Sequence, residues 1–274
     1  MLKMTLILVF PVVLLLPLIS GYNYCNNRTH VCNLSKRKHF MCQLEKDLPP
    51  FGNGTTFHAL VPDTTNMHLN ALGILNTFRN VFASGELITK RNKTFPTARR
   101  MRRLIWDAEL AYMARSHAAT VSFKHSECRS TLRFPLVGEC LALLPPSDQK
   151  LGLFDMLTSF FTKMFDEYKE VEDPEALLHA YDPAKDYHVG HFTTIISDRV
   201  SRVGCGIAVG SNCQVNNKVG FCHFLTCHFD GTNMEYQYVY RAGKPASSCH
   251  DWKATSSSRY AFLCTNNGGI FPYD

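Results

Sequence analysis

The stretch that decides the fold is residues 190–205, which read Gly-His-Phe-Thr-Thr-Ile-Ile-Ser-Asp-Arg-Val-Ser-Arg-Val-Gly-Cys. Residues 193–196 predict an extended strand, because branching at Cβ is better accommodated in a strand than in a helix. Gly190 lets the backbone enter that strand tightly, and His191 then stands at the strand start, where an imidazole can point into a cleft. Gly204 and Cys205 predict a turn into a second strand whose position a disulfide fixes.

The amino terminus has the pattern of a secretory signal peptide over residues 1–21. Lys3 supplies the positive start, residues 6–19 the apolar run, and Ser20 and Gly21 the small residues near a cleavage site. Two prolines and the short run disfavour the alternative, an uncleaved membrane anchor. We therefore expect a secreted, extracellular protein.

The composition agrees with secretion and excludes several other classes. Eleven cysteines imply a disulfide framework with one thiol left over, and sequons predict glycosylation at Asn27, Asn33, Asn53 and Asn92. The net charge of +6 is moderate and spread along the chain, whereas a nucleic-acid binder concentrates its basic residues on one surface. No later stretch is long and apolar enough to be a transmembrane segment.

Three helices and, besides the strand at 193–196, three strands are expected between the two loop-rich ends. Apolar residues at helical spacing predict helices over 65–84, 107–124 and 151–171. The first would be capped by Asp63, Thr64 or Thr65 and the second by Asp107. Alternating or aromatic runs predict strands over 203–209, 219–229 and 235–240.

Residues 90–103 carry seven basic side chains. A polyanion-binding patch, a processing-protease site at 99–103 and a solvated basic loop are all compatible with them, and the loop is favoured. Met101 and Leu104 are expected to point inward.

Several motifs together resemble the CAP superfamily, which comprises cysteine-rich secretory proteins, antigen 5 and pathogenesis-related 1 proteins. The matching segments are Leu-Ile-Trp-Asp-Ala-Glu-Leu-Ala at 104–111, Phe-Lys-His-Ser-Glu-Cys at 123–128, Gly-Glu-Cys-Leu-Ala at 138–142, Phe-Asp-Glu-Tyr at 165–168 and the stretch at 190–205. Four positions depart from the family pattern: Leu75, Cys140, Thr194 and Ser197.

The resemblance implies an α+β fold, a disulfide-braced three-layer α-β-α sandwich, and is strongest to the insect antigen 5 (venom allergen-like) branch. It divides the chain into a signal peptide (1–21), a cysteine-bearing amino-terminal extension (22–62), a CAP domain (63–241) and a disulfide-linked carboxy-terminal tail (242–274).

The antigen 5 framework implies three disulfides: Cys25–Cys42, Cys32–Cys128 and Cys205–Cys227. Two further pairs follow from position, because Cys213 and Cys222 flank the turn-like pair Asn216-Asn217 and because Cys249 and Cys264 share the tail. Cys140 is left over. A buried free thiol is the favoured interpretation, with an intermolecular bridge or a fourth metal ligand as alternatives.

The resemblance also implies a cleft lined by four residues from separate elements: His125, Glu139, Glu167 and His191. Two neutral imidazoles at about 2.0–2.1 Å from a metal suit Zn²⁺ with open positions for water. The carboxylates would either coordinate the metal or orient the imidazoles. Each residue also has an ordinary structural explanation, such as a cation at a helix carboxyl end for His125.

These observations predict a non-enzymatic binding or effector module. The resemblance implies as its partner an extracellular protein, a sterol or fatty-acid ligand, or a small amphiphile. A zinc-dependent hydrolase that uses the same cleft is one alternative, although neither a His-Glu-x-x-His helix nor a Gly-x-Ser-x-Gly elbow occurs. A structural secreted protein with a vestigial cleft is the other.

Overall fold

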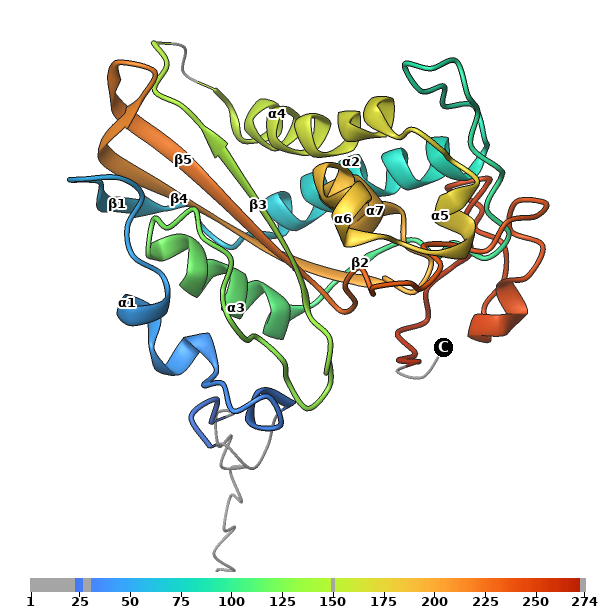
Figure 1. Ribbon diagram of the computed structural model, residues 1–274, viewed down its shortest axis with the longest axis horizontal. Helices are drawn as coiled ribbons and strands as arrows, with labels where there is room; N and C mark the ends of the chain where they lie inside the picture. Colours follow the sequence, from blue (N-terminus) through green and yellow to red (C-terminus); the bar gives the residue numbers. More distant parts are fainter. Residues whose placement is uncertain (1–22, 27–30, 149–150, 272–274) are drawn as a thin grey trace, which may run out of the picture.

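A sheet lies between two helical layers. The computed structural model describes residues 23–26, 31–148 and 151–271. Helix α3 (Ala108–Ala119) packs on one face of the sheet, and helices α2 (Thr65–Ala83) and α4 (Leu153–Phe165) cover the other (Figure 1). The predicted three-layer α-β-α fold is confirmed. In these described ranges, no helix combines the length and apolar character that crossing a membrane requires.

The sheet has the strand order β1-β4-β5-β3, with antiparallel pairing along this path and β2 parallel to β4. The strands are β1 (Thr56–Leu60), β2 (Ile105–Trp106), β3 (Gly138–Leu144), β4 (Arg202–Val215) and β5 (Lys218–Phe229). The β4–β5 hairpin turns at Asn216 and Asn217, whose φ angles of 48° and 64° suit a two-residue hairpin loop. The predicted strands over 203–209 and 219–229 are confirmed, whereas β1, β2 and β3 were not predicted.

The predicted strand over 235–240 is wrong. In this segment Glu235 forms one isolated bridge, with Tyr181, and Tyr236 takes a left-handed backbone with φ 57°. A residue with that φ interrupts the extended geometry that a ladder of hydrogen bonds needs. Within the segment Val239 and Tyr240 are buried in the core, whereas Tyr236 is exposed.

The first predicted helix matches α2, and the other two predictions are too long. The Thr64 hydroxyl accepts the amide of Met67, and the Asp107 carboxylate accepts the amides of Glu109 and Leu110, so both helices begin at the expected caps. Helix α3 ends at Ala119, shortly before Val121 turns left-handed with φ 48°. Helix α4 ends at Phe165 and continues as the 3₁₀ helix η3 (Asp166–Glu170).

Short helices make up the remaining regular structure. They are η1 (Val31–Asn33), η2 (Phe40–Cys42), α1 (Leu44–Asp47), α5 (Ala176–His179), α6 (Pro183–Asp186), η4 (Tyr187–Val189), α7 (Gly190–Ile196) and η5 (Cys249–Trp252).

Helix α7 overturns the prediction of a strand at 193–196. Two interactions replace the strand preference of these β-branched residues. The Glu167 carboxylate accepts the amides of His191 and Phe192 in the first turn of the helix. The hydroxyls of Thr193 and Thr194 donate to the carbonyl of Gly190, one turn back. Tertiary burial and capping therefore outweigh local propensity here.

Gly204 and Cys205 do not form the predicted turn, because both lie inside β4. A Cβ built on Gly204 would stand 2.0 Å from the backbone nitrogen of Ala111, and one on Gly206 would stand 2.5 Å from the Cα of Arg115. The glycines let helix α3 approach the sheet closely.

Five disulfides are present among the described residues, and they join the pairs that the sequence analysis names. They are Cys25–Cys42, Cys32–Cys128, Cys205–Cys227, Cys213–Cys222 and Cys249–Cys264. Cys140 is an unbridged, buried thiol.

The basic stretch at 90–103 divides into two halves. Lys90, Arg91 and Lys93 are exposed, whereas Arg100 and Arg102 are buried. The Arg100 guanidinium pairs with the buried carboxylate of Asp198 at 2.9 Å and stacks on the Trp252 ring of the tail. Around Arg100 and Arg102 the stretch is therefore neither a solvated loop nor an accessible processing site. It binds the tail to the domain. Met101 and Leu104 point inward as predicted.

Candidate functional site

All four residues of the predicted cleft line one cavity of about 410 Å³. His125 lies in the irregular loop after α3, and Glu139 is the second residue of β3. Glu167 lies in η3, and His191 in the first turn of α7. The fold thus brings together residues that are up to 66 positions apart, because β3, η3 and α7 each contribute a side chain to this cavity.

The first pair is His125 with Glu139. The Nδ1 atom of His125 lies 2.8 Å from Oε1 of Glu139, and the same oxygen accepts the Ser126 amide at 2.9 Å. The other oxygen of Glu139 accepts the Ser126 hydroxyl at 2.8 Å and the Nε2 atom of His228 at 3.0 Å. The Glu139 side chain is fully buried, while the His125 ring is 53% exposed.

Electrostatics keep the Glu139 carboxylate ionised. Burial by itself would raise the pKa of Glu139, but Arg129, whose Nη1 lies 3.6 Å from Oε1, and the hydrogen bonds from His125 and His228 hold this pKa well below its usual value. Burial lowers the pKa of His228 to about 4 and also lowers the pKa of His117, another buried histidine beside Glu139. At neutral pH both of these buried rings are therefore uncharged.

The second pair is His191 with Glu167. The Nδ1 atom of His191 lies 2.6 Å from Oε1 of Glu167, and the other oxygen accepts the amides of His191 and Phe192 at 3.0 Å each. The Glu167 carboxylate therefore orients the His191 ring and satisfies the amino end of α7 at once. Both side chains are partly exposed, at 32% for His191 and 20% for Glu167.

The donor set fits a metal in a limited way. Each ring uses Nδ1 on a carboxylate, which leaves the two Nε2 atoms as ligands. The carboxylates are already occupied by the amides, hydroxyl and imidazoles described above, so they orient the rings and do not offer ready ligand oxygens. Within the described ranges, no group of three or more His, Cys, Asp or Glu side chains is arranged to hold a metal ion. A zinc ion here would thus have two protein ligands, with water or a bound molecule completing its coordination.

Cys140 is buried next to Glu139 but does not line the cavity. Burial raises the pKa of its thiol, and the Thr194 hydroxyl contacts it. A thiol that stays protonated is a poor metal ligand, which disfavours a fourth-ligand role. Cys140 and Thr194 are two of the four departures from the family pattern, so these two departures are in contact with each other.

Sequence reasoning missed three residues of the site: His117, Arg129 and His228. His117 lies on the buried stripe of α3, which reads as ordinary core, and His228 faces Glu139 only through the β3–β5 register. Arg129 lines the cavity and donates to the carbonyls of Val137 and Ser126. Its position directly after Cys128 was the one available signal.

Comparisons with known proteins agree with this fold. A model of the cysteine-rich secretory protein (CAP) family matches residues 72–229. Venom allergen-1 of Aedes albopictus is 29% identical over 229 residues, which cover 83% of this chain and 82% of that protein. The solved structure of BmVAL-1 has a TM-score of 0.61 at 22% identity and covers 74% of this chain and 96% of its own. NaASP2, solved with Zn²⁺, has a TM-score of 0.57 at 21% identity, with 74% and 98% coverage.

Proposed function

The chain belongs to the cysteine-rich secretory protein (CAP) family, with insect venom allergens among its relatives, and on that premise we propose that it is an extracellular binding or effector module. Its cleft takes a divalent metal ion through His125 and His191. The observation that carries the proposal is that both rings line one cavity while a carboxylate holds the Nδ1 atom of each. A structural relative of this fold was solved with Zn²⁺.

Metal binding is tested by calorimetry on purified protein that has been stripped of metal. We expect about one zinc per chain, and His125→Gln or His191→Gln should each weaken binding about tenfold or more, because each removes one of two protein ligands. His250→Gln is the matched control, since His250 is an exposed tail histidine outside the cavity. Equal affinity in all four proteins would remove the metal proposal.

The geometry favours a binding site over a zinc-dependent hydrolase. A general base must be able to accept a proton from water, but both oxygens of Glu139 already accept hydrogen bonds and its pKa is held low. Zinc-loaded protein offered ester and peptide libraries should show no turnover. Turnover that requires zinc and disappears in Glu139→Gln would establish the hydrolase. If the protein shows neither turnover nor metal binding, the remaining interpretation is a structural secreted protein with a vestigial cleft.

A second candidate function is the binding of an anionic amphiphile between α2 and α4. A groove of about 430 Å³ runs there, with Phe78 and the exposed side chains of Leu69 and Phe154 along it and Arg259 at its edge. Besides these apolar side chains and one cation, the groove is lined by the polar side chains of Asn70, Thr77, Thr158 and Thr162. This combination suits a hydrocarbon chain that ends in a carboxylate.

This groove offers a clean test, because a Cβ at Gly73 would meet no atom within 4 Å. Gly73→Leu would thus place an apolar side chain in the groove from a Cβ that has room, and it would also favour the helix. We expect a fluorescent fatty acid to bind the unmodified protein and to lose about tenfold in affinity in Gly73→Leu. Leu132→Ala, at an exposed apolar position outside the groove, is the control.

The proposal also includes cleavage of a signal peptide, the division into extension, domain and tail, and glycosylation at four sequons. The signal peptide at 1–21 and the sequon residue Asn27 lie outside the described residues. Asn53 and Asn92 are exposed in turns, which supports their glycosylation, and Asn33 is proposed from its sequon alone. Mass spectrometry of the secreted protein before and after glycosidase treatment tests all four sites and the new amino terminus.

A further inference from the structure

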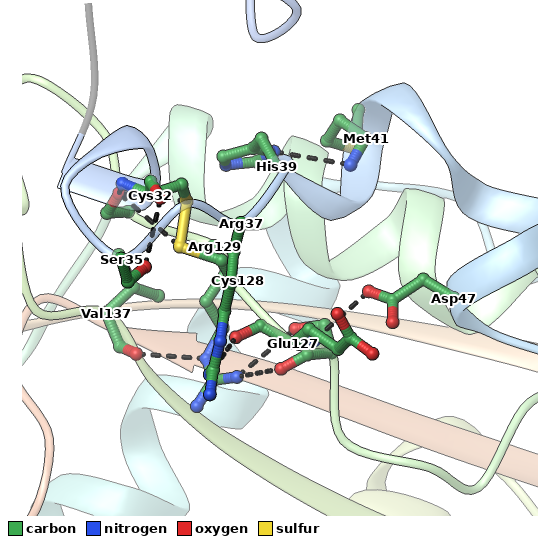
Figure 2. Close-up of a disulfide and its surroundings, with 12 residues drawn as sticks. Cys32, Ser35, Arg37, His39, Met41, Asp47, Glu127, Cys128, Arg129 and Val137 are labelled. Carbon is green, nitrogen blue, oxygen red and sulfur yellow. Dashed lines mark hydrogen bonds between the residues drawn. A yellow bond between two sulfur atoms is a disulfide. The ribbon is translucent and has the colours of Figure 1, made fainter. Parts of the chain in front are cut away.

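The amino-terminal extension, residues 22–62, holds the loop that carries His125. Residues 120–137 contain no helix or strand, so the position of the loop depends on contacts with other segments. The Cys32–Cys128 disulfide joins extension and loop across 96 residues (Figure 2). The Phe40 amide also donates to the carbonyl of Cys128 at 2.9 Å. The two segments are therefore fastened covalently only three residues from His125.

Further contacts flank His125 on both sides. The buried carboxylate of Asp47 accepts the Glu127 amide at 3.1 Å, and Arg37 donates to the Glu127 carbonyl at 3.2 Å (Figure 2). On the other side, the Lys124 ammonium donates to the Asp47 carbonyl at 3.0 Å. Between Lys124 and Glu127 lie only His125 and Ser126, the two residues whose side chains and amide reach Glu139.

The extension also packs against the two buried histidines that lie next to Glu139. Phe40 is fully buried, and its ring packs edge-on against His228 with centroids 5.8 Å apart and lies 6.1 Å from His117. These two histidines stand against the Glu139 carboxylate. The extension thus touches the surroundings of both members of the first pair, the loop of His125 and the histidines behind Glu139.

We propose that the amino-terminal extension is a positioning element of the cleft, and that Asp47 and the Cys32–Cys128 bridge set where the His125 ring stands. Reduction of this disulfide, or cleavage of the extension, therefore alters the part of the cleft that His125 and Glu139 form. This inference concerns the cleft of the proposed function, but it is tested on metal-free protein, so its failure and that of metal binding are distinguishable.

The test uses Asp47→Ala in the full chain, with all disulfides intact. Asp47→Asn is the conservative variant, because its side-chain carbonyl can still accept the Glu127 amide. Glu45→Ala is the control, since Glu45 is exposed on the same short helix. The measurements are amide hydrogen exchange at Ser126 and Glu127 and the imidazole NMR signals of His125 and His191.

In Asp47→Ala we expect exchange at Ser126 and Glu127 to rise about tenfold or more and the His125 signal to shift or broaden, with the His191 signal unchanged. Asp47→Asn should restore most of the protection, and Glu45→Ala should resemble the unmodified protein. A Cys32→Ser/Cys128→Ser double variant, compared with Cys249→Ser/Cys264→Ser in the tail, should reproduce the effect of Asp47→Ala.

Two results would overturn the proposal. One is unchanged exchange at Ser126 and Glu127 together with an unchanged His125 signal in Asp47→Ala. The other is an equal change at His125 and His191, which would show general destabilisation and not positioning of one ring. If the double cysteine variant does not fold, the Asp47 series decides alone. If the unmodified protein binds no zinc, the metal site is refuted, but the exchange result at Ser126 and Glu127 still tests the positioning role.

Discussion

The two halves of the cleft are the His125–Glu139 pair and the His191–Glu167 pair. Both pair a histidine with a glutamate, but different parts of the fold hold each pair in place. In the first half, Glu139 is fully buried and is held by hydrogen bonds from Ser126, His125 and His228. In the second half, Glu167 is 20% exposed and accepts the amides at the start of α7 in addition to His191. The first depends on a disulfide and on a distant segment, and the second on one short helix. The same contact between Nδ1 and a carboxylate oxygen can thus be built on a buried polar cluster or on a helix cap.

The largest expected difference is in stability. Glu139→Ala leaves the buried donors of Ser126 and His228 without their acceptor, so we expect the free energy of unfolding to fall by about 3–5 kcal/mol. Glu167→Ala exposes the amides of α7 to water that can replace the lost bonds, so we expect a loss of about 1–2 kcal/mol. Urea unfolding at pH 7 measures both. Equal losses would mean that the two supports are energetically alike.

The buried histidines give the first half a pH dependence. Burial lowers the pKa of His228 to about 4 from an ordinary 6.5, so between these pH values the unfolded chain binds a proton that the folded chain does not. The free energy of unfolding should therefore fall as the pH drops, by about 2 kcal/mol from this group between pH 7 and pH 5.

Urea unfolding of His228→Asn tests this window. The variant should lose less stability between pH 7 and pH 5, while His250→Asn should behave like the unmodified protein. The lowered pKa of Glu139 acts in a separate window, because its stabilising contribution is present above its ordinary pKa of 4.5 and is lost as the pH falls through the lower folded value. If His228→Asn loses as much unfolding free energy between pH 7 and pH 5 as the unmodified protein, His228 is not the source of this pH dependence.

Zinc binding, which uses both halves, should weaken in acid. An imidazole must be neutral to coordinate a metal, and its reference pKa is about 6.5. Calorimetric affinity should thus fall about tenfold or more between pH 7.5 and pH 5. An affinity that is the same at both pH values would rule out ligation by His125 and His191.

The smallest effect is expected from the exposed ion pairs near the second half. Lys90 pairs with Glu170 at the end of η3, and both side chains are about half exposed or more. Such pairs contribute about 0–1 kcal/mol, so Lys90→Ala should change the free energy of unfolding by less than about 0.5 kcal/mol and leave zinc affinity unaltered. A larger loss would show that the second half also depends on a distant segment.

The parts of the fold that sequence reasoning anticipated are those with local or covalent signals. Thr64 and Asp107 mark helix starts through their own side chains, and the hairpin residues Asn216 and Asn217 favour positive φ. Segments decided by distant partners were missed. Residues 193–196 form a helix because Glu167 caps it and the core buries it.

The same distinction holds within the site. His125, Glu139, Glu167 and His191 stand in motifs that the family resemblance marks, whereas His228 meets Glu139 only through the pairing of β3 with β5. His117 reads as an ordinary member of an apolar helical stripe. No spacing along the chain relates Phe40 or Asp47 to the cleft, because a disulfide across 96 residues brings them there.

One NMR titration tests the central claim most directly. Zinc is added to metal-free protein at pH 7.5 while the ring signals of His125, His191 and the tail histidine His250 are followed. We predict that the Nε2 signals of His125 and His191 change together and saturate at about one zinc per chain, while His250 does not respond. Response of only one cleft histidine, or equal response of all three, would contradict a metal site shared by the two halves of the cleft.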